Sequence, residues 1–212
     1  MPNMTRNEYL QTLFAERISK SKAQHKKALD LAHDIRKFEI SLYWQRAAYF
    51  WTFISVTFGA LYVVDDKFEF SYIVTCFGVV FSLAWYFVSR GSKAWQKNWE
   101  YHVDLLEDEI SGPLYKTIIG KNSFRFLSLL DGYPFSPSKI NHALALFVTG
   151  IWAFLVFRAA SKVNWSNISH RWAFWITTGL TIVTLIALCR AKTSPTQKNI
   201  VVNVESRTYR PK

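Results

Sequence analysis

Residues 71–113 read SYIVTCFGVVFSLAWYFVSRGSKAWQKNWEYHVDLLEDEISGP, an apolar block followed directly by a charged one. Its first nineteen residues carry no charge and can cross a bilayer as a helix of about 28 Å. The residues that follow are charged, yet apolar side chains recur among them every three or four positions as far as Ile110. Gly112 and Pro113 then end the pattern, as at a helix C-terminus. The stretch predicts one helix that spans the membrane and continues beyond it.

Three more blocks meet the length and hydrophobicity of a membrane span. With Ser71–Ser89 they give four spans, the others being Ala47–Val64, His142–Ala160 and Trp172–Cys189. Aromatic residues make up 17% of the 212 residues, as is typical of membrane helices and their interfacial belts. The fold class predicted is an all-α membrane protein with four transmembrane helices.

The distribution of Lys and Arg predicts the orientation of these spans. Nine lie before the first span, seven in residues 90–140 and six from Arg190 onward, whereas the first loop, Asp65–Phe70, has only Lys67. The short third loop has Lys162 between Arg158 and Arg171 at the helix ends. Because cytoplasmic segments are enriched in positive residues, both termini and the middle segment are predicted to be cytoplasmic. The net charge of +11 then reflects topology and contact with anionic lipid, and nucleic-acid binding is not expected.

The first two helices are expected to extend into the cytoplasm as a helical hairpin. A three-to-four spacing can be traced from Leu10 to Leu31, Ile35, Phe38 and Leu42 without a proline or glycine before the first span. The predicted organisation is a cytoplasmic helix that enters the membrane (1–46), a transmembrane hairpin (47–89), a cytoplasmic extension and loop (90–140), a second transmembrane hairpin (141–190) and a basic tail (191–212).

An apolar stripe on the second helix marks the expected packing face of this cytoplasmic hairpin. It consists of Trp95, Trp99, Val103, Leu106 and Ile110, opposite a charged face of Lys93, Lys97, Glu100, Asp104 and Glu107. Two helices alone offer little surface to bury such a stripe, and exposed apolar patches usually have a partner. The stripe therefore predicts contacts between subunits.

Small and hydroxyl-bearing side chains inside the spans have two interpretations each. The pairs Ser55 with Gly59 and Gly78 with Ser82 have the spacing of close helix contacts. One face of the fourth span carries Thr177, Thr181 and Thr184, which could line a pore or pack and bond back to the helix. Packing is the favoured interpretation.

The sequence lacks the motifs that would support catalysis or metal binding. No HExxH, CxxC, GxSxG or phosphate-loop motif occurs, and Cys76 and Cys189 lie in apolar blocks. His102 has leucines at the third and fourth positions after it, where a helical metal site would place its ligands. The spans contain no Asp, Glu or Lys, which disfavours an ion-coupled transporter. We therefore expect no enzymatic activity, no cofactor and no metal.

Several strings together resemble the RipA-like octameric membrane proteins of bacteria. They are DIRKFEI (34–40), SLAW (82–85), RGSK (90–93), WQKNWE (95–100), HVDLLEDE (102–109) and GPLYK (112–116), and the resemblance covers roughly residues 30–155. It implies a bacterial inner-membrane location and a ring-like homo-oligomer, an octamer, but brings no established reaction and no catalytic residues.

The function expected is that of a homo-oligomeric inner-membrane scaffold or channel-like assembly that also contacts membrane lipids. One alternative is a pore-forming effector of an antiviral or stress response. Another is a membrane adaptor for a soluble cytoplasmic partner. Membrane depolarisation on overexpression would separate a pore from a scaffold.

Overall fold

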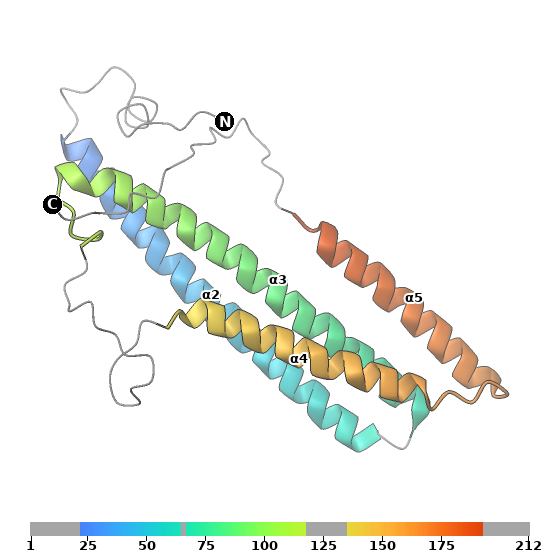
Figure 1. Ribbon diagram of the computed structural model, residues 1–212. Coiled ribbons are helices and arrows are strands. Elements are labelled where there is room, and N and C mark those ends of the chain that lie inside the picture. The colour runs from blue at the N-terminus through green and yellow to red at the C-terminus, as the bar shows by residue number, and fades with distance from the viewer. Residues whose placement is uncertain (1–21, 65–66, 118–134, 193–212) are drawn as a thin grey trace, which may run out of the picture. The chain divides into compact units, whose positions relative to one another are not determined.

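The computed structural model describes residues 22–64, 67–117 and 135–192. These ranges contain four α-helices and a short 3-10 turn but no strand (Figure 1): α2 Lys22–Val64, α3 Phe68–Leu106, η2 Glu107–Glu109, α4 Pro137–Ala160 and α5 Ile168–Arg190. Each of the four helices is long and apolar enough to cross a membrane. The predicted all-α membrane fold is confirmed.

Each predicted span lies within one helix, and the first two helices are much longer than their spans. Helix α2 has 43 residues and α3 has 39, whereas about 20 suffice to cross a bilayer. Helices α4 and α5, with 24 and 23 residues, are close to the minimum. The expectations for residues 1–21, for 118–134 and for the tail from 193 fall outside the described residues.

The ends of the helices follow local chemistry. Helix α3 ends at Leu106, earlier than predicted, because the η2 turn intervenes before Gly112. Gly112 has a φ of 69°, the left-handed conformation that glycine adopts without a steric penalty. Helix α4 begins with Pro137 at its first position, where the missing N–H costs nothing. Asn167 caps α5 by accepting a hydrogen bond from the backbone N–H of Ser169 at 2.9 Å.

The described residues divide into two compact units. The first, which we call the hairpin unit, comprises residues 22–39 and 95–117. Its core consists of Leu29 and Ala32 of α2 packed against Val103 and Leu106 of α3. Such packing buries one face of each helix within a single chain.

The face of α2 that is buried in the hairpin unit differs from the one traced in the sequence. Leu31 and Phe38, both on the traced spacing, are 59% and 60% exposed, whereas Leu29 and Ala32 are buried. The small Ala32 side chain allows a close approach of the helices, because interaxial distance depends on the side chains at the contact. The periodicity is therefore present, but its two exposed members, Leu31 and Phe38, are not part of the buried contact with α3.

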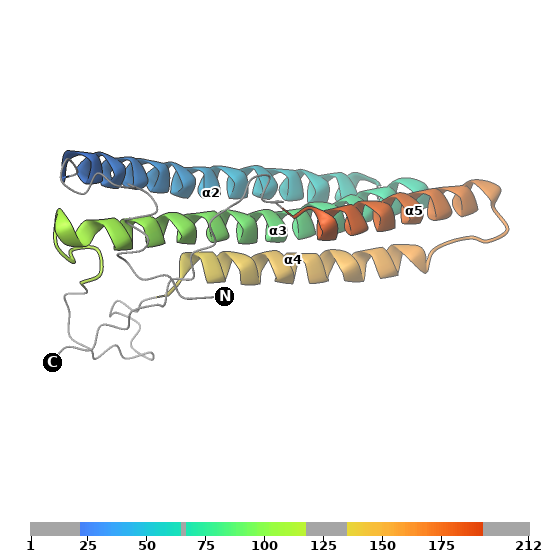
Figure 2. The same cartoon turned by 90° about the horizontal axis from the view of Figure 1, so that it is seen from above.

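The second unit, the membrane unit, comprises residues 40–64, 67–94 and 135–192. Trp152 of α4 is fully buried and stacks on Phe58 of α2, with ring centroids 4.2 Å apart. Farther along the bundle, Ile54, Trp85 and Ala145 bring α2, α3 and α4 together in a second cluster. Within this unit, the corresponding parts of the three helices run side by side in both views (Figure 2).

Within the membrane unit, helix α5 packs on α3. Tyr72 stacks on Phe174 at 5.2 Å, and its hydroxyl lies 2.8 Å from that of Thr178. No residue of α5 within its described range is buried. Most of its apolar surface is thus left for lipid or for another subunit.

Candidate functional site

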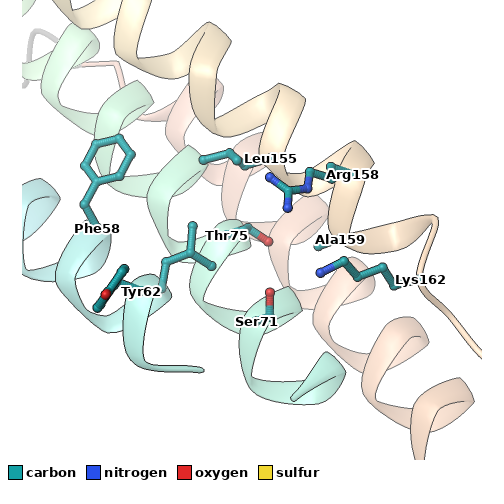
Figure 3. Close-up of a pocket in the computed structure, with 9 residues that line it drawn as sticks. Phe58, Tyr62, Ser71, Thr75, Leu155, Arg158, Ala159 and Lys162 are labelled. Atoms are coloured by element: carbon teal, nitrogen blue, oxygen red, sulfur yellow. The ribbon is translucent and has the colours of Figure 1, made fainter. Parts of the chain in front are cut away.

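A polar pocket lies where α2 ends, α3 begins and α4 ends, within the membrane unit (Figure 3). Its volume is about 500 Å³. Phe58, Leu61 and Leu155 give it apolar walls. Ser71 and Thr75 of α3 contribute hydroxyls, and Tyr62 adds a third from α2. A cavity of this size with a few convergent polar groups is a candidate binding site.

Two cationic side chains reach this pocket from the end of α4. Figure 3 shows Arg158 and Lys162 extending from that segment toward the side on which α3 lies. The helical turn is continued past Ala160, because the N–H of Lys162 donates to the carbonyl of Ala159 at 3.1 Å. The four-residue spacing therefore places both cations on one side of the helix. In the sequence, Arg158 is recognisable as a residue at a span end, but no pattern connects it with the α3 hydroxyls.

A second polar cluster joins α2, α3 and α4 in the interior of the membrane unit. The amide nitrogen of Asn141 donates to the Tyr43 hydroxyl at 2.7 Å and to the Ser89 hydroxyl at 3.2 Å. All three residues are buried. Buried hydrogen bonds between membrane helices stabilise their packing, so we interpret this cluster as a structural contact that holds three helices together. The sequence offers no periodic signal for it, since the partners are 52 and 98 residues from Asn141.

The first turn of α5 is tied to the start of α3. Glu69 accepts a hydrogen bond from the Ser169 hydroxyl at 3.0 Å and lies 3.5 Å from Nε2 of His170. The His170 ring also stacks on Phe68, with centroids 4.6 Å apart. These contacts hold the N-terminal end of α5 against α3.

The predicted stripe on α3 is covered to different degrees within one chain. Val103 and Leu106 are fully or almost fully buried, and Trp99 and Ile110 pack against the same cluster. The expectation that a single hairpin could not bury Val103 and Leu106 is wrong, because Leu29 and Ala32 of α2 cover them. Only Trp95 remains largely uncovered, with 47% exposure.

The charged face of the hairpin unit also differs from the expectation in one residue. Glu107 is 2% exposed, and its Oε2 accepts the backbone N–H of Tyr115 at 2.8 Å. Lys116 pairs with Asp108 at 2.7 Å and with Asp104 at 3.4 Å. The segment after Gly112 therefore folds back onto the end of α3, which the sequence pattern did not reveal.

Two of the three threonines, Thr181 and Thr184, bond back to their own helix. The Thr181 hydroxyl donates to the carbonyl of Thr177 at 2.7 Å, and that of Thr184 to the carbonyl of Leu180 at 2.8 Å. Thr184 is exposed, whereas Thr177 and Thr181 are half-buried. A hydroxyl satisfied in this way needs no pore water, although its lone pairs can still accept a hydrogen bond.

The two small-residue pairs have different surroundings. Gly78 lies under the indole of Trp152, and Ser82 is fully buried with its hydroxyl bonded to the Gly78 carbonyl at 2.8 Å. Ser55 and Gly59 are exposed, and a Cβ added at Gly59 would have no described atom within 4 Å. One pair serves a contact inside the chain, and the other remains open to a neighbour.

Four membrane-length helices, packed through aromatic and small side chains, define an all-α, multi-pass membrane protein. The model of the octameric membrane protein family (8xMP) matches residues 26–161. The chain belongs to this family, whose description gives self-association as an octamer. The resemblance to octameric membrane proteins seen in the sequence is thereby confirmed. No curated protein and no solved structure matches the chain.

Proposed function

We propose that the protein forms a scaffold or channel-like octameric assembly in the bacterial inner membrane, with both termini cytoplasmic and without enzymatic activity. The hairpin unit supplies contacts between subunits on the cytoplasmic side. The trend of Lys and Arg along the chain supports this orientation. Self-association itself follows from membership of an octameric family.

The exposed apolar stripe of α2 carries this proposal. Leu31 lies sixteen residues before Ala47, where the predicted span begins, which corresponds to about 24 Å along a helix. The headgroup layer adds only about 5–8 Å on each side of the hydrocarbon core. Lipid therefore cannot cover Leu31. Because Leu31 and Phe38 are both exposed and lie outside the buried face of α2, we expect a protein partner to cover them. A second copy of the chain is the partner that the family's octameric assembly supplies.

Substitutions on this stripe test the proposal. We expect the double variant Leu31→Ser and Phe38→Ser to dissociate the detergent-purified octamer into smaller species while its helical content is retained. Light scattering coupled to size exclusion measures the mass, and circular dichroism measures helicity. Lys27→Ser, on exposed surface of the same helix, is the matched control and should leave the octamer intact.

The core of the hairpin unit gives a second comparison. Leu29→Ser removes a buried contact with α3, so it should lower helicity or thermal stability as well as mass. An octamer of unchanged mass in the Leu31 and Phe38 variant would contradict the proposed interface. Loss of helicity in that variant would show that the stripe belongs to the fold of one subunit instead.

A pore-forming effector is the second candidate, and α5 is the observation that favours it. This helix has no buried residue in its described range and carries Thr177, Thr181 and Thr184 along one side, and the hydroxyl oxygens of Thr181 and Thr184 can still accept a hydrogen bond. In a ring of subunits such a helix could face a central path. Rapid depolarisation of cells on overexpression, abolished by Thr181→Val and Thr184→Val, would favour a pore over a scaffold.

A further inference from the structure

The pocket at the end of the membrane unit combines three chemical features that are typical of a binding site. Arg158 and Lys162 bring two positive charges, Ser71 and Thr75 bring hydroxyls, and the described lining contains no carboxylate. The remaining lining is apolar, with Phe58 and Leu155 on opposite helices. An anionic group with an apolar attachment matches this surface.

The hydroxyls have capacity for a ligand. Ser71 is 3% exposed, and within the described part of the chain its hydroxyl makes no hydrogen bond. The Thr75 hydroxyl donates to the carbonyl of Tyr72 at 2.9 Å, so its oxygen can only accept a further hydrogen bond. The Ser71 hydroxyl is therefore the one that can donate to a ligand. One hydroxyl donor on α3 thus faces the same cavity as two cations from the end of α4 (Figure 3).

The position of the pocket along the helices matches the depth of lipid headgroups. Arg158 is two residues from the end of α4, and Ser71 is three residues from the start of α3. Both lie at a predicted span boundary, where phosphate groups of the bilayer are found and where arginine side chains extend to meet them.

From this geometry we infer that the pocket binds a phosphate-bearing anion, held by the Arg158 guanidinium, the Lys162 ammonium and the Ser71 hydroxyl. A guanidinium offers several N–H donors to phosphate oxygens, and an ammonium adds a point charge. The apolar walls favour an anionic phospholipid headgroup as the source over free inorganic phosphate. The site does not depend on whether the assembly conducts.

Thermal unfolding with added ligands tests this site and separates the two sources. The detergent-purified octamer is titrated with phosphatidylglycerol, with phosphatidylcholine or with sodium phosphate, and unfolding is followed by tryptophan fluorescence. We expect phosphatidylglycerol to raise the midpoint at concentrations where phosphatidylcholine does not. Stabilisation by sodium phosphate alone would keep the phosphate site but assign it to a free anion.

Variants distinguish the pocket from general attraction of lipid to a basic protein. Arg158→Gln and Lys162→Gln should each weaken the apparent affinity for phosphatidylglycerol about tenfold or more, the effect of losing one charge-assisted hydrogen bond. Arg158→Lys keeps the charge and should retain more affinity than Arg158→Gln. Arg171→Gln, an exposed arginine near the start of α5 that does not line the pocket, is the matched control and should bind like the wild type.

Three results would overturn the inference. One is equal stabilisation by phosphatidylglycerol and phosphatidylcholine, and another is no stabilisation by either phosphatidylglycerol or sodium phosphate. The third is an unchanged affinity in both Arg158→Gln and Lys162→Gln. Ser71→Ala guards against variants that misfold, because it removes one small hydroxyl and should weaken binding while the octamer and its unliganded melting midpoint are retained.

Discussion

Gly78 is the residue at which helix packing in the membrane unit is most sensitive to a single methyl group. A Cβ at this position would overlap the indole ring of Trp152, which is fully buried and held by Phe58 on its other side. We expect Gly78→Ala to destabilise the protein by about 1–3 kcal/mol, the usual cost of overpacking a core. Unfolding of the purified protein in mixed micelles with increasing denaturing detergent measures the change.

Gly59 provides the control for this substitution. It lies in the same bundle, has the same helical conformation and has open space around its Cα within one chain. Gly59→Ala should leave the stability of the subunit unchanged or slightly raised, because alanine is the better helix former. Equal destabilisation by both variants would mean that the contact between Gly78 and Trp152 is not what limits stability.

His102 is expected to make the hairpin unit sensitive to acid. Burial lowers the pKa of this imidazole from its ordinary value of 6.5, and its ring lies 5.0 Å from that of Trp99. The unfolded chain then binds more protons than the folded one between the two pKa values. Stability is therefore complete above about pH 6.5 and declines as the pH falls through that value toward the lowered pKa.

Melting midpoints at pH 7.5 and pH 5.5 measure this effect. His102→Phe keeps an aromatic ring against Trp99 but cannot be protonated, so its midpoint should fall less than that of the wild type between the two conditions. His33→Phe, on the opposite helix of the same unit, reports the contribution of another histidine. An identical loss in wild type and His102→Phe would show that other groups cause the acid sensitivity.

The sequence could identify residues suited to close packing but not which of them are used. Both small-residue pairs had the same spacing, and only the position of Trp152, 74 residues after Gly78, distinguishes them in the structure. Asn141 and Glu107 were missed for the same reason, since their partners are set by tertiary structure. Helix periodicity predicts a face, whereas a buried polar contact depends on residues distant in the chain.

At the scale of the helices, hydrophobic length was the most informative signal. A long run of uncharged, apolar residues predicts a membrane span. Each span is expected to be helical because backbone groups without hydrogen bonds are costly in lipid. Partner choice was less predictable. The apolar spacing of α2 contained Leu31 and Phe38, yet α3 packs on Leu29 and Ala32, where the small Ala32 side chain allows the closer approach.

The orientation of the helices is testable by chemical labelling. Native Cys76 and Cys189 are first replaced by serine, and single cysteines are introduced at exposed positions. A membrane-impermeant maleimide should label Ser166→Cys in intact cells, because the loop around it has few positive charges. Leu114→Cys, 74% exposed, should react only after the membrane is permeabilised.

Lys192→Cys is a further internal control for this orientation, because it follows α5 and should behave like Leu114→Cys. Labelling of either position from outside intact cells, with Ser166→Cys protected, would invert the topology and place the hairpin unit outside the cell.

In the whole chain, the four spans contribute to a membrane unit, and the parts of α2 and α3 beyond their spans contribute to a hairpin unit. Each has its own buried cluster, so neither needs the other subunits to form its core. What each leaves uncovered differs in kind. The exposed side chains of α5 can be covered by lipid, whereas Leu31 lies beyond its reach, and this difference supports the proposal that the hairpin unit makes the contacts between subunits.

Conduction by the assembled protein, if present, is expected to proceed without a titratable relay. The four predicted spans contain no Asp, Glu or Lys, and charges at bilayer depth are kept mainly where transport or sensing needs them. His142, at the start of the third span, lies edge-on to Tyr86 at 6.0 Å and is the histidine nearest to the membrane on the predicted cytoplasmic side. We therefore expect ion flux through the octamer in liposomes to depend only weakly on pH between about 6 and 8. Substrate uptake driven by a proton gradient that persists in His142→Ala would contradict this expectation and indicate a coupled transporter. A complete lack of flux at every pH would instead favour the scaffold.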